Sequence, residues 1–438
     1  MSLKVVKFGG SSLASADQFR KVASIIKADK NRRYAVASAP GKRFTGDFKV
    51  TDMFYLLYDK ASSGESIEEL FGEISYRYTD IANDLGVDLP LDKELSKIKA
   101  ALYGMAGRDY AASRGEYLNS MILAKHMGYD FIDAAEVIFF KTDGTFDAER
   151  TNAVLSERLK KHEYAVVPGF YGSMPNGTIK TFSRGGSDIT GSILARAANA
   201  TLYENWTDVS GFLMTDPRIV ENPKVIETIT YRELRELSYM GATVLHEDAI
   251  FPVQIAGIPI NIKNTNAPDD PGTMIVASSD KYDTKNIITG IAGKKGFSSI
   301  HIEKDMMNGE VGFTRKILSV FEEMNISFEH LPSGIDTMTI MLKTADIDAI
   351  REQLIASIKK AVKPDSIYIQ DGIALVAVVG RAMVKAKGTA AKVFKAIASA
   401  DVNIKMIDQG SDEMNIIIGI EEGDFEKAVN AIYKEFIA

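Results

Sequence analysis

The sequence predicts an α/β protein in which a largely parallel sheet with helices on both faces is followed by two small βαββαβ units of the ferredoxin type. Two observations carry this prediction. Short apolar, strand-like segments alternate with amphipathic, helix-like segments over roughly the first two-thirds of the chain. Such alternation is typical of a parallel sheet covered on both faces. The remaining part contains an internal repeat, and each copy has the element order of a ferredoxin-like unit.

The first strand is expected at residues 3–8, directly before Gly9 and Gly10. Further buried strands are expected at 34–39, 165–167, 201–206 and 258–262. Helical periodicity predicts helices at 16–28, 51–58, 66–85, 91–105, 109–127, 187–198, 231–239 and 243–256. Ligands of parallel sheets bind beyond the carboxyl ends of the strands, so functional residues are expected in the loops there.

The internal repeat lies in the last part of the chain. Residues 312–342 align without gaps onto residues 388–418, and apolar positions such as Ile317 and Val393 match in register. A chance match would not keep so many buried positions in one register, so we infer a duplication. Each copy reads strand, helix, strand, turn, strand, and second helices are expected at 347–355 and 425–433.

The turn-rich stretch 264–283 is the preferred boundary before the repeat. We therefore expect a large domain over 1–283, a first repeat unit over 284–372 and a second over 373–438. A leading strand near 287–292 is expected to be able to pair with the second unit.

The composition excludes several classes of function. The 438 residues include 45% hydrophobic and 25% charged side chains, which is ordinary for a globular protein. A net charge of -7 argues against broad binding to nucleic acid or to anionic membranes. The absence of cysteine excludes disulfides and thiolate catalysis. With no signal-peptide pattern and no apolar run long enough to span a bilayer, a cytoplasmic protein is expected.

Two glycine-rich motifs predict anion binding. KFGGSS, residues 7–12, follows the first strand, and its glycines let backbone N–H groups approach a phosphate that Lys7 could neutralise. SRGGSD, residues 183–188, precedes a helix, and Arg184 could clamp a carboxylate. An ordinary tight turn and an ordinary helix cap by Ser187 or Asp188 are the alternatives.

Three further motifs are weaker when each is taken alone. SAPGKRFTGD, residues 38–47, follows a strand and offers hydroxyls and cations, but it could be a solvated loop. WTDVSGFLMTDPR, residues 206–218, places Thr207 and Asp208 at a strand end, with a capped turn as the alternative. In SRGE, residues 113–116, a glycine inside a helix suggests close approach of a ligand or of another helix.

Taken together, these strings resemble the aspartokinases of the amino-acid kinase superfamily. The matching strings are KFGGSS, SAPGKRFTGD, RGE, SRGGSD, WTDVSGFLMTDPR, KNTNAPDDPGT and QGSDEMNI, in the family's order over nearly the whole chain. The repeat is similar to the paired ACT domains of that family. The resemblance implies an amino-acid-kinase-like sheet followed by two ACT units, and the length fits a form without a fused dehydrogenase.

The resemblance implies the reaction ATP + L-aspartate → ADP + 4-phospho-L-aspartate with Mg²⁺, which opens lysine, threonine and methionine biosynthesis. It implies that Lys7 and Asp188 are catalytic, and it assigns no side-chain metal ligand. The implied aspartate contacts are Ser38, Thr45, Glu116, Arg184, Gly185, Gly186 and Ser187. The implied ATP contacts are Lys7, Phe8, Gly9, Gly10, Thr207, Asp208, Leu213, Arg218, Thr243 and Val244.

This chemistry is consistent with the scarcity of histidine, of which the chain has five. A side-chain carboxylate has a pKa of about 4 and is already ionised at neutral pH, so the acceptor needs no general base. The main barrier is bringing two anions together. Lys7, Mg²⁺ and backbone N–H groups would screen that repulsion and hold the reacting groups in line.

Two departures from the family pattern keep alternatives open. The chain reads GATVLHE at 241–247 where the family often reads GAKVLHP, so Thr243 replaces a lysine expected near the nucleotide phosphates. Leu213 stands where an aromatic nucleotide contact is common. A catalytically weak or silent amino-acid sensor, and a related acyl-phosphate-forming kinase such as a glutamate kinase, therefore remain alternatives.

The resemblance also implies feedback inhibition by an end-product amino acid at the ACT units. The candidate effector residues are Met307, Gly312, Glu329 and Ser333, and Glu329 could accept the effector's ammonium. Lysine is the first choice and threonine remains open. A core Met307 and a solvated Glu329 are the alternative. ACT units of the family pair between chains, which implies a homodimer or homotetramer.

Overall fold

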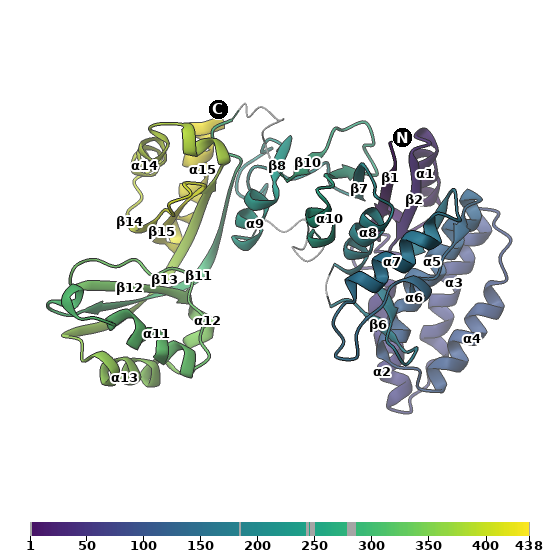
Figure 1. Cartoon of the computed structure of the whole chain (residues 1–438), viewed down its shortest axis with the longest axis horizontal. Helices are drawn as coiled ribbons and strands as arrows, with labels where there is room; N and C mark the ends of the chain where they lie inside the picture. The colour runs from purple at the N-terminus through teal and green to yellow at the C-terminus, as the bar shows by residue number, and fades with distance from the viewer. Residues whose placement is uncertain (1, 184, 242–244, 246–249, 278–285, 438) are drawn as a thin grey trace. The chain divides into compact units, whose positions relative to one another are not determined.

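The computed structural model describes residues 2–183, 185–241, 245, 250–277 and 286–437. The chain forms two compact units (Figure 1), and each is described by itself. The first unit comprises Met1–Phe212, Val225–Tyr231 and Val244–Tyr282. The second comprises Leu213–Lys224, Arg232–Thr243 and Asp283–Ala438. None of the helices in the described part of the chain combines the length and hydrophobicity that crossing a bilayer needs.

An eight-stranded sheet organises the first unit, in the order β3-β4-β2-β1-β7-β9-β10-β8. Its strands are β1 (Lys4–Phe8), β2 (Arg32–Ala37), β3 (Asp130–Phe131), β4 (Ala165–Pro168), β7 (Leu202–Thr207), β8 (Thr228–Thr230), β9 (Ile260–Asn264) and β10 (Thr273–Val276). Every neighbouring pair is parallel except β9 and β10. The carboxyl ends of the parallel strands therefore lie at one edge, where the glycine-rich motifs begin.

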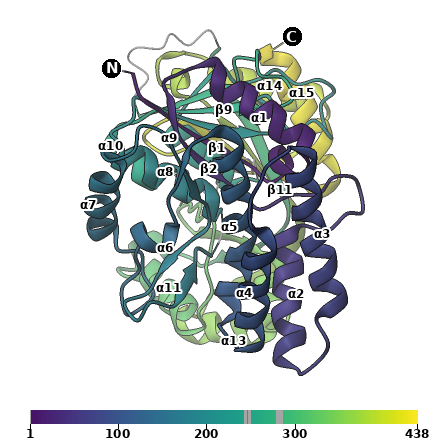
Figure 2. The ribbon, with the colours of Figure 1, turned by 90° about the vertical axis from the view of Figure 1, so that its right-hand side faces the viewer.

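Helices cover both faces of this sheet. They are α1 (Ala16–Ala28), α2 (Val50–Ser62), α3 (Glu68–Asp84), α4 (Leu91–Tyr103), α5 (Arg108–Met127), α6 (Ala134–Val137), α7 (Ala148–Leu159), α8 (Gly186–Ala197) and α10 (Phe251–Ala256). Side chains alternate along a strand. Accordingly, Val6 and Phe8 pack in a core with α1–α5, while Lys7 faces α8. Figures 1 and 2 show α8 and the α3–α4 pair on opposite sides of β1 and β2.

The second unit contains a five-stranded antiparallel sheet in the order β12-β11-β13-β15-β14. Its strands are β11 (Gly290–Glu303), β12 (Thr337–Lys343), β13 (Ser366–Val379), β14 (Ile404–Asp408) and β15 (Asn415–Glu421). Its helices are α11 (Phe313–Glu323), α12 (Thr344–Ile347), α13 (Arg351–Val362), α14 (Thr389–Ser399) and α15 (Phe425–Ile437). Most of α9 (Tyr231–Tyr239) also belongs to this unit.

The duplication is visible in the backbone. Helices α11 and α14 occupy aligned positions, and each follows a left-handed glycine, with φ of 83° at Gly312 and 84° at Gly388. The long strands β11 and β13 each extend through both repeats. Residues 290–294 pair with 375–379, and residues 297–303 pair with 366–373. The predicted fold class, a largely parallel sheet followed by two ferredoxin-like ACT units, is confirmed.

Some predicted element bounds differ from the structure. The turn-rich stretch 264–283 contains β10, a short strand of the main sheet hidden among turn residues. The helix predicted at 347–355 is two helices, α12 and α13, because the turn at 348–350 separates them. Of the helix predicted at 243–256, only α10 lies within the described residues. A hairpin of two antiparallel strands, β5 (Tyr171–Ser173) and β6 (Ile179–Thr181), precedes α8.

Candidate active site

Two glycine turns meet at the carboxyl edge of the sheet. The Gly9 N–H donates to the Trp206 carbonyl at 2.9 Å, and the Gly41 N–H donates to the Gly10 carbonyl at 2.8 Å. A Cβ atom on Gly41 would lie 2.6 Å from the Gly10 carbonyl carbon, and one on Gly10 would lie 2.9 Å from the Ala39 oxygen. The structure therefore places the KFGGSS turn and the start of the SAPGKRFTGD loop in direct backbone contact.

Lys7 lies beside this turn, on the face of the sheet that α8 covers. Its ammonium is 2.6 Å from Asp188 Oδ1 and 3.4 Å from Asn205 Oδ1, and the Asn205 amide donates to Asp188 Oδ1 at 2.9 Å. The Lys7 side chain is 9% exposed and that of Asp188 is 19% exposed. A nearly buried cation is thus held in one orientation with a hydrogen-bonded carboxylate at its side.

Asn205 was missed by the sequence reasoning. It is buried on β7, next to Trp206, and the same strand also contains the polar residues Glu204 and Thr207, so its residue type alone is a weak signal. Its position near the carboxyl end of a central strand could have identified it as a site residue, because side chains there lie at the same edge of the sheet as Lys7.

The SRGGSD motif starts α8. Gly185 caps the helix in the left-handed conformation, with φ of 56°, and Ser187 and Asp188 lie in the first turn. A Cβ on Gly169 would lie 2.5 Å from Ser187 Oγ, so the chain before the β5–β6 hairpin packs tightly against this helix start. Unpaired N–H groups and the positive end of the helix dipole favour an anion here. Arg184 lies outside the described residues.

Glu116 is fully buried on α5, behind the loop that follows β2. Burial raises the pKa of its carboxyl to about 8, while the Ala39 N–H and the Arg114 guanidinium act in the opposite direction. Its Oε2 atom makes no hydrogen bond to any described residue. A buried oxygen without a partner is uncommon and suggests that a donor is supplied by a ligand.

The close approach that Gly115 allows is to the protein itself. A Cβ at this position would lie 2.8 Å from the Ala39 Cβ, and the Gly115 carbonyl accepts from the Tyr78 hydroxyl at 2.8 Å. Gly115 therefore lets α5 pack against the loop after β2, which brings Glu116 close to Ser38 and the glycine turns.

The loop that carries Ser38 and Thr45 is folded around a buried carboxylate. Asp47 accepts from the Arg43 backbone and guanidinium at 2.9 Å, which holds the pKa of its carboxyl well below the usual range. Ser38 is half-buried, and its carbonyl accepts from the Asn119 amide at 2.7 Å. Thr45 is exposed at the tip of the loop.

Besides Lys7, Gly9 and Gly10, the predicted nucleotide residues that the structure describes fall into three groups. Phe8 is buried and stacks on Trp206, so only its backbone can reach a ligand at the turn. Thr207 is the last residue of β7, and its hydroxyl donates to Oδ1 of the next residue, Asp208, at 3.1 Å. Leu213 and Arg218 belong to the second unit, where the exposed Arg218 pairs with Asp216 at 2.6 Å. Thr243 and Val244 lie outside the described residues.

The candidate effector residues lie in the first repeat. Met307 is 6% exposed and belongs to the core of that repeat, and Gly312 caps α11. The Glu329 side chain is only 8% exposed, and its Oε1 lies 3.5 Å from the Lys343 ammonium. Its Oε2 accepts from the Tyr239 hydroxyl of α9. Ser333 is exposed.

The fold and the site together match a known class of enzymes. A model of the amino acid kinase family matches residues 2–264, and an ACT domain model matches residues 376–436. The chain is therefore an amino acid kinase with a C-terminal ACT region.

Comparison with individual proteins narrows the class. Aspartokinase 3 of Bacillus subtilis is 42% identical, over 100% of this chain and 99% of that protein. The structure of Clostridium acetobutylicum aspartate kinase is 54% identical, with a TM-score of 0.90 and coverage of 100% and 99% of the two chains. Escherichia coli aspartokinase III, solved with aspartate and ADP, shares the fold over 100% of both chains at 23% identity and a TM-score of 0.73. The chain belongs to the aspartokinase family.

Proposed function

We propose that this chain transfers the γ-phosphoryl group of ATP to the side-chain carboxylate of L-aspartate, giving ADP and 4-phospho-L-aspartate. The proposal is supported most directly by Lys7, whose buried ammonium is held beside two glycine turns by Asp188 and Asn205. The relatives from B. subtilis and C. acetobutylicum are both aspartate kinases, which agrees with it.

Catalysis depends on holding the two substrates in line and on neutralising the charge of the phosphoryl group. An aspartate oxygen attacks the γ-phosphorus, the bond from the γ-phosphorus to the bridging oxygen breaks, and ADP leaves with that electron pair. The nucleophile is already ionised, so no proton is removed from it. Lys7 neutralises charge on the transferring group, and the N–H groups of Gly9, Gly10 and the α8 start bind the anionic oxygens.

The substrate's remaining groups are proposed to be held by the surrounding loops. Glu116 supplies a carboxylate for the ammonium, and its unpartnered Oε2 supports this role. Arg184 and Ser187 bind the α-carboxylate, with Gly185 and Gly186 allowing close approach. Ser38 and Thr45 border the reacting end, and Asp188 keeps Lys7 in place.

Mg²⁺ is proposed as the partner of ATP. Among the described residues, no group of three or more Asp, Glu or His side chains could hold a metal ion alone. Protein Mg²⁺ sites of kinases use one or two carboxylates together with phosphate oxygens and water, and Asp188 is a carboxylate of that kind. The residues present therefore fit an ion held mainly by ATP, which when bound neutralises phosphate charge.

Trapping of the acyl phosphate with hydroxylamine tests the activity. We expect hydroxamate to form from aspartate and not from glutamate, and Lys7→Ala to lower its rate by about 10²-fold or more. Lys27→Ala on the outer part of α1 serves as the matched control and should leave the rate unchanged. Hydroxamate from glutamate would indicate a related kinase, and no turnover with either acid would indicate a sensor.

Lysine is the proposed feedback inhibitor, bound at Met307, Gly312, Glu329 and Ser333. E. coli aspartokinase III, which has the same fold, is solved with lysine and aspartate in a T-state. The buried carboxylate of Glu329 is suited to an effector ammonium. The same hydroxamate assay with added lysine, threonine or methionine distinguishes the effectors, and inhibition by threonine alone would overturn this choice.

A homodimer or homotetramer formed through the ACT units is also proposed. Three apolar side chains near the candidate effector residues are strongly exposed: Met306 at 79%, Val311 at 97% and Ile335 at 68%. Light scattering after gel filtration tests this, with Val311→Asp expected to lower the measured mass. A wild-type chain that elutes as a monomer would rule the assembly out.

A further inference from the structure

The loop that carries Thr45 has little apolar contact with the rest of the first unit. Asp47 is the one buried residue among positions 42–49, all of which the structure describes. The aromatic side chains of this stretch face solvent, with Phe44 at 64% and Phe48 at 68% exposure. Burial of apolar surface therefore contributes little to holding the loop. A loop of this kind opens easily unless polar groups fix it.

The buried carboxylate of Asp47 shapes the loop from within. The Arg43 backbone N–H and the Arg43 guanidinium both donate to Asp47 Oδ2 at 2.9 Å. The Arg43 side chain is 40% exposed, whereas that of Asp47 is 8% exposed. Because both residues belong to the same loop, this pair defines its shape but does not attach it to another element.

Arg77 of α3 attaches the loop at both of its ends. Its guanidinium donates to the Phe48 carbonyl at 2.9 Å and to the Gly41 carbonyl. The same group lies 3.3 Å from Asp47 Oδ2, and the Arg77 side chain is only 5% exposed. The planar fork of donors on arginine suits several acceptors at once. One guanidinium thus contacts the two ends of the loop and the carboxylate between them.

Helix α3 gives these contacts a rigid support. It packs in the core of the first unit through Ile74, Tyr78 and Ile81, among others. Tyr78, the neighbour of Arg77, donates its hydroxyl to the Gly115 carbonyl at 2.8 Å. Gly115 precedes Glu116, so two consecutive residues of α3 hold two separate segments of the proposed aspartate pocket.

Stability alone is a weak reason for burying this arginine. Taking two charges out of water costs free energy, and a buried ion pair often adds little to stability. The Arg77 Nε atom is also buried without a hydrogen bond to any described residue. Since the other guanidinium nitrogens bond to the loop, Arg77 acts on a ligand through the loop and not by direct contact.

We propose that Arg77 is a positioning residue, which holds the loop at 41–48 in place so that Thr45 is oriented before aspartate binds. The inference rests on the proposed function for the identity of the substrate, while the attachment of the loop rests on the contacts of Arg77 alone. A loop that is ordered for only a fraction of the time binds its substrate more weakly by that fraction. Arg77 therefore lowers the KM for aspartate.

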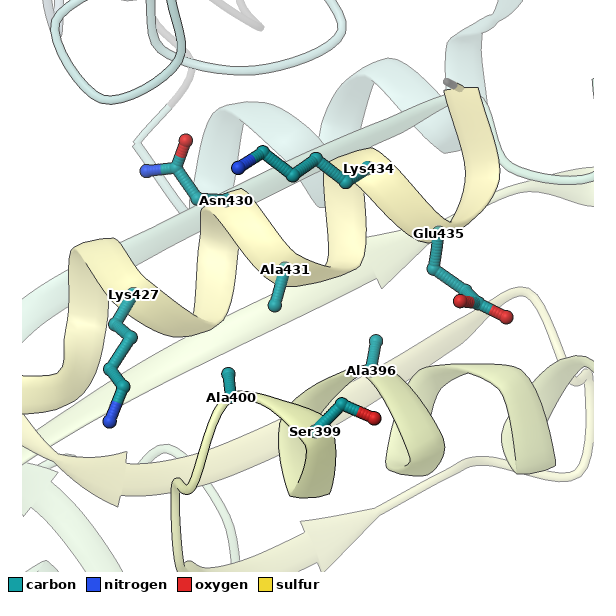
Figure 3. A pocket seen from close by; sticks show the side chains of 8 residues that line it. All are labelled: Ala396, Ser399, Ala400, Lys427, Asn430, Ala431, Lys434 and Glu435. Carbon is teal, nitrogen blue, oxygen red and sulfur yellow. The ribbon is translucent and has the colours of Figure 1, made fainter.

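A groove in the second unit supports no comparable argument. It measures about 450 Å³ and lies between α14 and α15, as Figure 3 shows. Its lining includes Ala396, Ala400 and Ala431. The Lys427 ammonium donates to the Asp401 carbonyl at 3.2 Å, and Glu435 pairs with Lys395 at 3.4 Å. Alanines beside charges that already have partners do not define a ligand.

Initial rates of hydroxamate formation by the full chain test the role of Arg77. For Arg77→Met we expect the KM for aspartate to rise by about tenfold or more, while kcat changes by less than about threefold. The KM for ATP should change by less than about twofold. Asp47→Asn keeps the shape of the side chain and removes the charge that Arg77 faces, so it should raise the KM for aspartate in the same way.

Arg32→Met is the matched control, because Arg32 is another poorly exposed arginine of the first unit. Its side chain is 12% exposed, and its guanidinium donates to Glu204 at 2.8 Å and to the Ile25 carbonyl at 2.5 Å. Arg32 begins β2, at the end opposite to Ser38. Its loss should lower the melting temperature and leave the KM for aspartate unchanged. A KM that rises no more in Arg77→Met and Asp47→Asn than in Arg32→Met would overturn the proposal.

Hydrogen exchange of the substrate-free chain tests the attachment of the loop without relying on the reaction. Amide exchange in peptides covering 41–49 should become about tenfold faster in Arg77→Met and stay at the wild-type rate in Arg32→Met. If the wild type formed no hydroxamate from aspartate, the proposed function would fail, and exchange would still show whether Arg77 fixes the loop. Exchange at the wild-type rate in Arg77→Met would overturn the inference whatever the substrate.

Discussion

Glu116 shows how one buried residue can link pH to both stability and substrate binding. It is fully buried, its pKa is raised to about 8, and one carboxylate oxygen has no partner among the described residues. At neutral pH the carboxyl is therefore mostly protonated before substrate arrives. A substrate ammonium would favour the ionised form, so binding and proton release are linked.

Glu116 should make the folded state less stable as pH rises. Between its ordinary pKa of 4.5 and about 8, the folded chain binds one more proton than the unfolded chain. The free energy of unfolding then falls by about 1.4 kcal/mol per pH unit from this group, and the loss is complete above pH 8. Urea unfolding at pH 5.5 and 7.5, followed by fluorescence, should show that Glu116→Gln removes this slope. The exposed Glu73→Gln should retain it, and an identical slope in Glu116→Gln would contradict the assignment.

The same proton should affect the KM for aspartate. If Glu116 must ionise to bind the ammonium, KM should fall as pH rises from 6 to 8, by up to about tenfold per unit below the pKa. Glu116→Gln should show a high KM with little dependence on pH, while kcat changes less. Initial rates over this pH range measure both constants. A wild-type KM that stays constant over the range would exclude a binding role for the charged form.

Helix α8 carries Asp188 and packs tightly against the sheet. A Cβ on Gly191 would overlap the Tyr203 hydroxyl, whereas a Cβ on Gly72 of α3 would meet open space. Gly191→Ala should therefore destabilise the chain by about 1–3 kcal/mol and lower kcat by displacing Asp188. Gly72→Ala should stabilise it by up to about 1 kcal/mol. The free energy of unfolding in denaturant and the rate of hydroxamate formation should be measured for both variants. Equal effects of Gly191→Ala and Gly72→Ala would contradict this packing of α8.

Helix α9 is held within the second unit at several points. Glu233, which is fully buried, pairs with Arg381 at 2.7 Å, and Glu236 accepts from the Asn415 amide at 2.7 Å. At the end of the helix, the Tyr239 hydroxyl donates to Glu329, and burial raises the tyrosine pKa to about 12. An effector ammonium that binds Glu329 Oε2 would compete with the Tyr239 hydroxyl for that oxygen.

Tyr239→Phe should therefore increase sensitivity to lysine. Removing the hydroxyl takes away the group that competes for Glu329 Oε2, while Lys343 stays near Oε1. A hydrogen bond to a charged group contributes enough to lower the midpoint of inhibition by about 3–10-fold. Tyr433→Phe, on α15, removes a hydroxyl that accepts from the Lys224 N–H and is the matched control. Inhibition curves with increasing lysine provide the measurement, and an unchanged or higher midpoint for Tyr239→Phe would contradict the competition.

The success of sequence prediction also varied from element to element. Helix α1 was predicted with its observed bounds because Ser15 caps a clear amphipathic pattern. In contrast, β10 is only four residues long and lies among turn residues, so its apolar pattern was not recognised. The KFGGSS and SAPGKRFTGD motifs follow predicted strands, and the parallel pairing of β1 and β2 explains why they meet. Asn205 and Gly41 were missed because their roles depend on neighbours that are distant in sequence.

At the scale of the whole molecule, each of the two units contains a hydrophobic core. One core packs β1, β2 and helices α1–α5, and another packs α11 and α13 against the sheet of the second unit. The chain has one tryptophan, Trp206, and it is buried in the first unit. Its fluorescence therefore reports the unfolding of the first unit, while circular dichroism reports both.

Because Trp206 lies in the first unit, we expect a substitution inside the second unit to change the circular dichroism melt and to leave the Trp206 fluorescence transition unchanged. Arg381→Met removes the guanidinium that pairs with the buried Glu233 carboxylate, which should destabilise the second unit by about 3–5 kcal/mol. The circular dichroism melt should then gain an earlier transition, while the Trp206 fluorescence transition stays in place. In the wild type, lysine should raise the temperature of the circular dichroism transition, because it binds the folded second unit. If fluorescence and circular dichroism shifted together in Arg381→Met, the two cores would unfold as a single cooperative unit, and regulation would have to act through the stability of the whole chain.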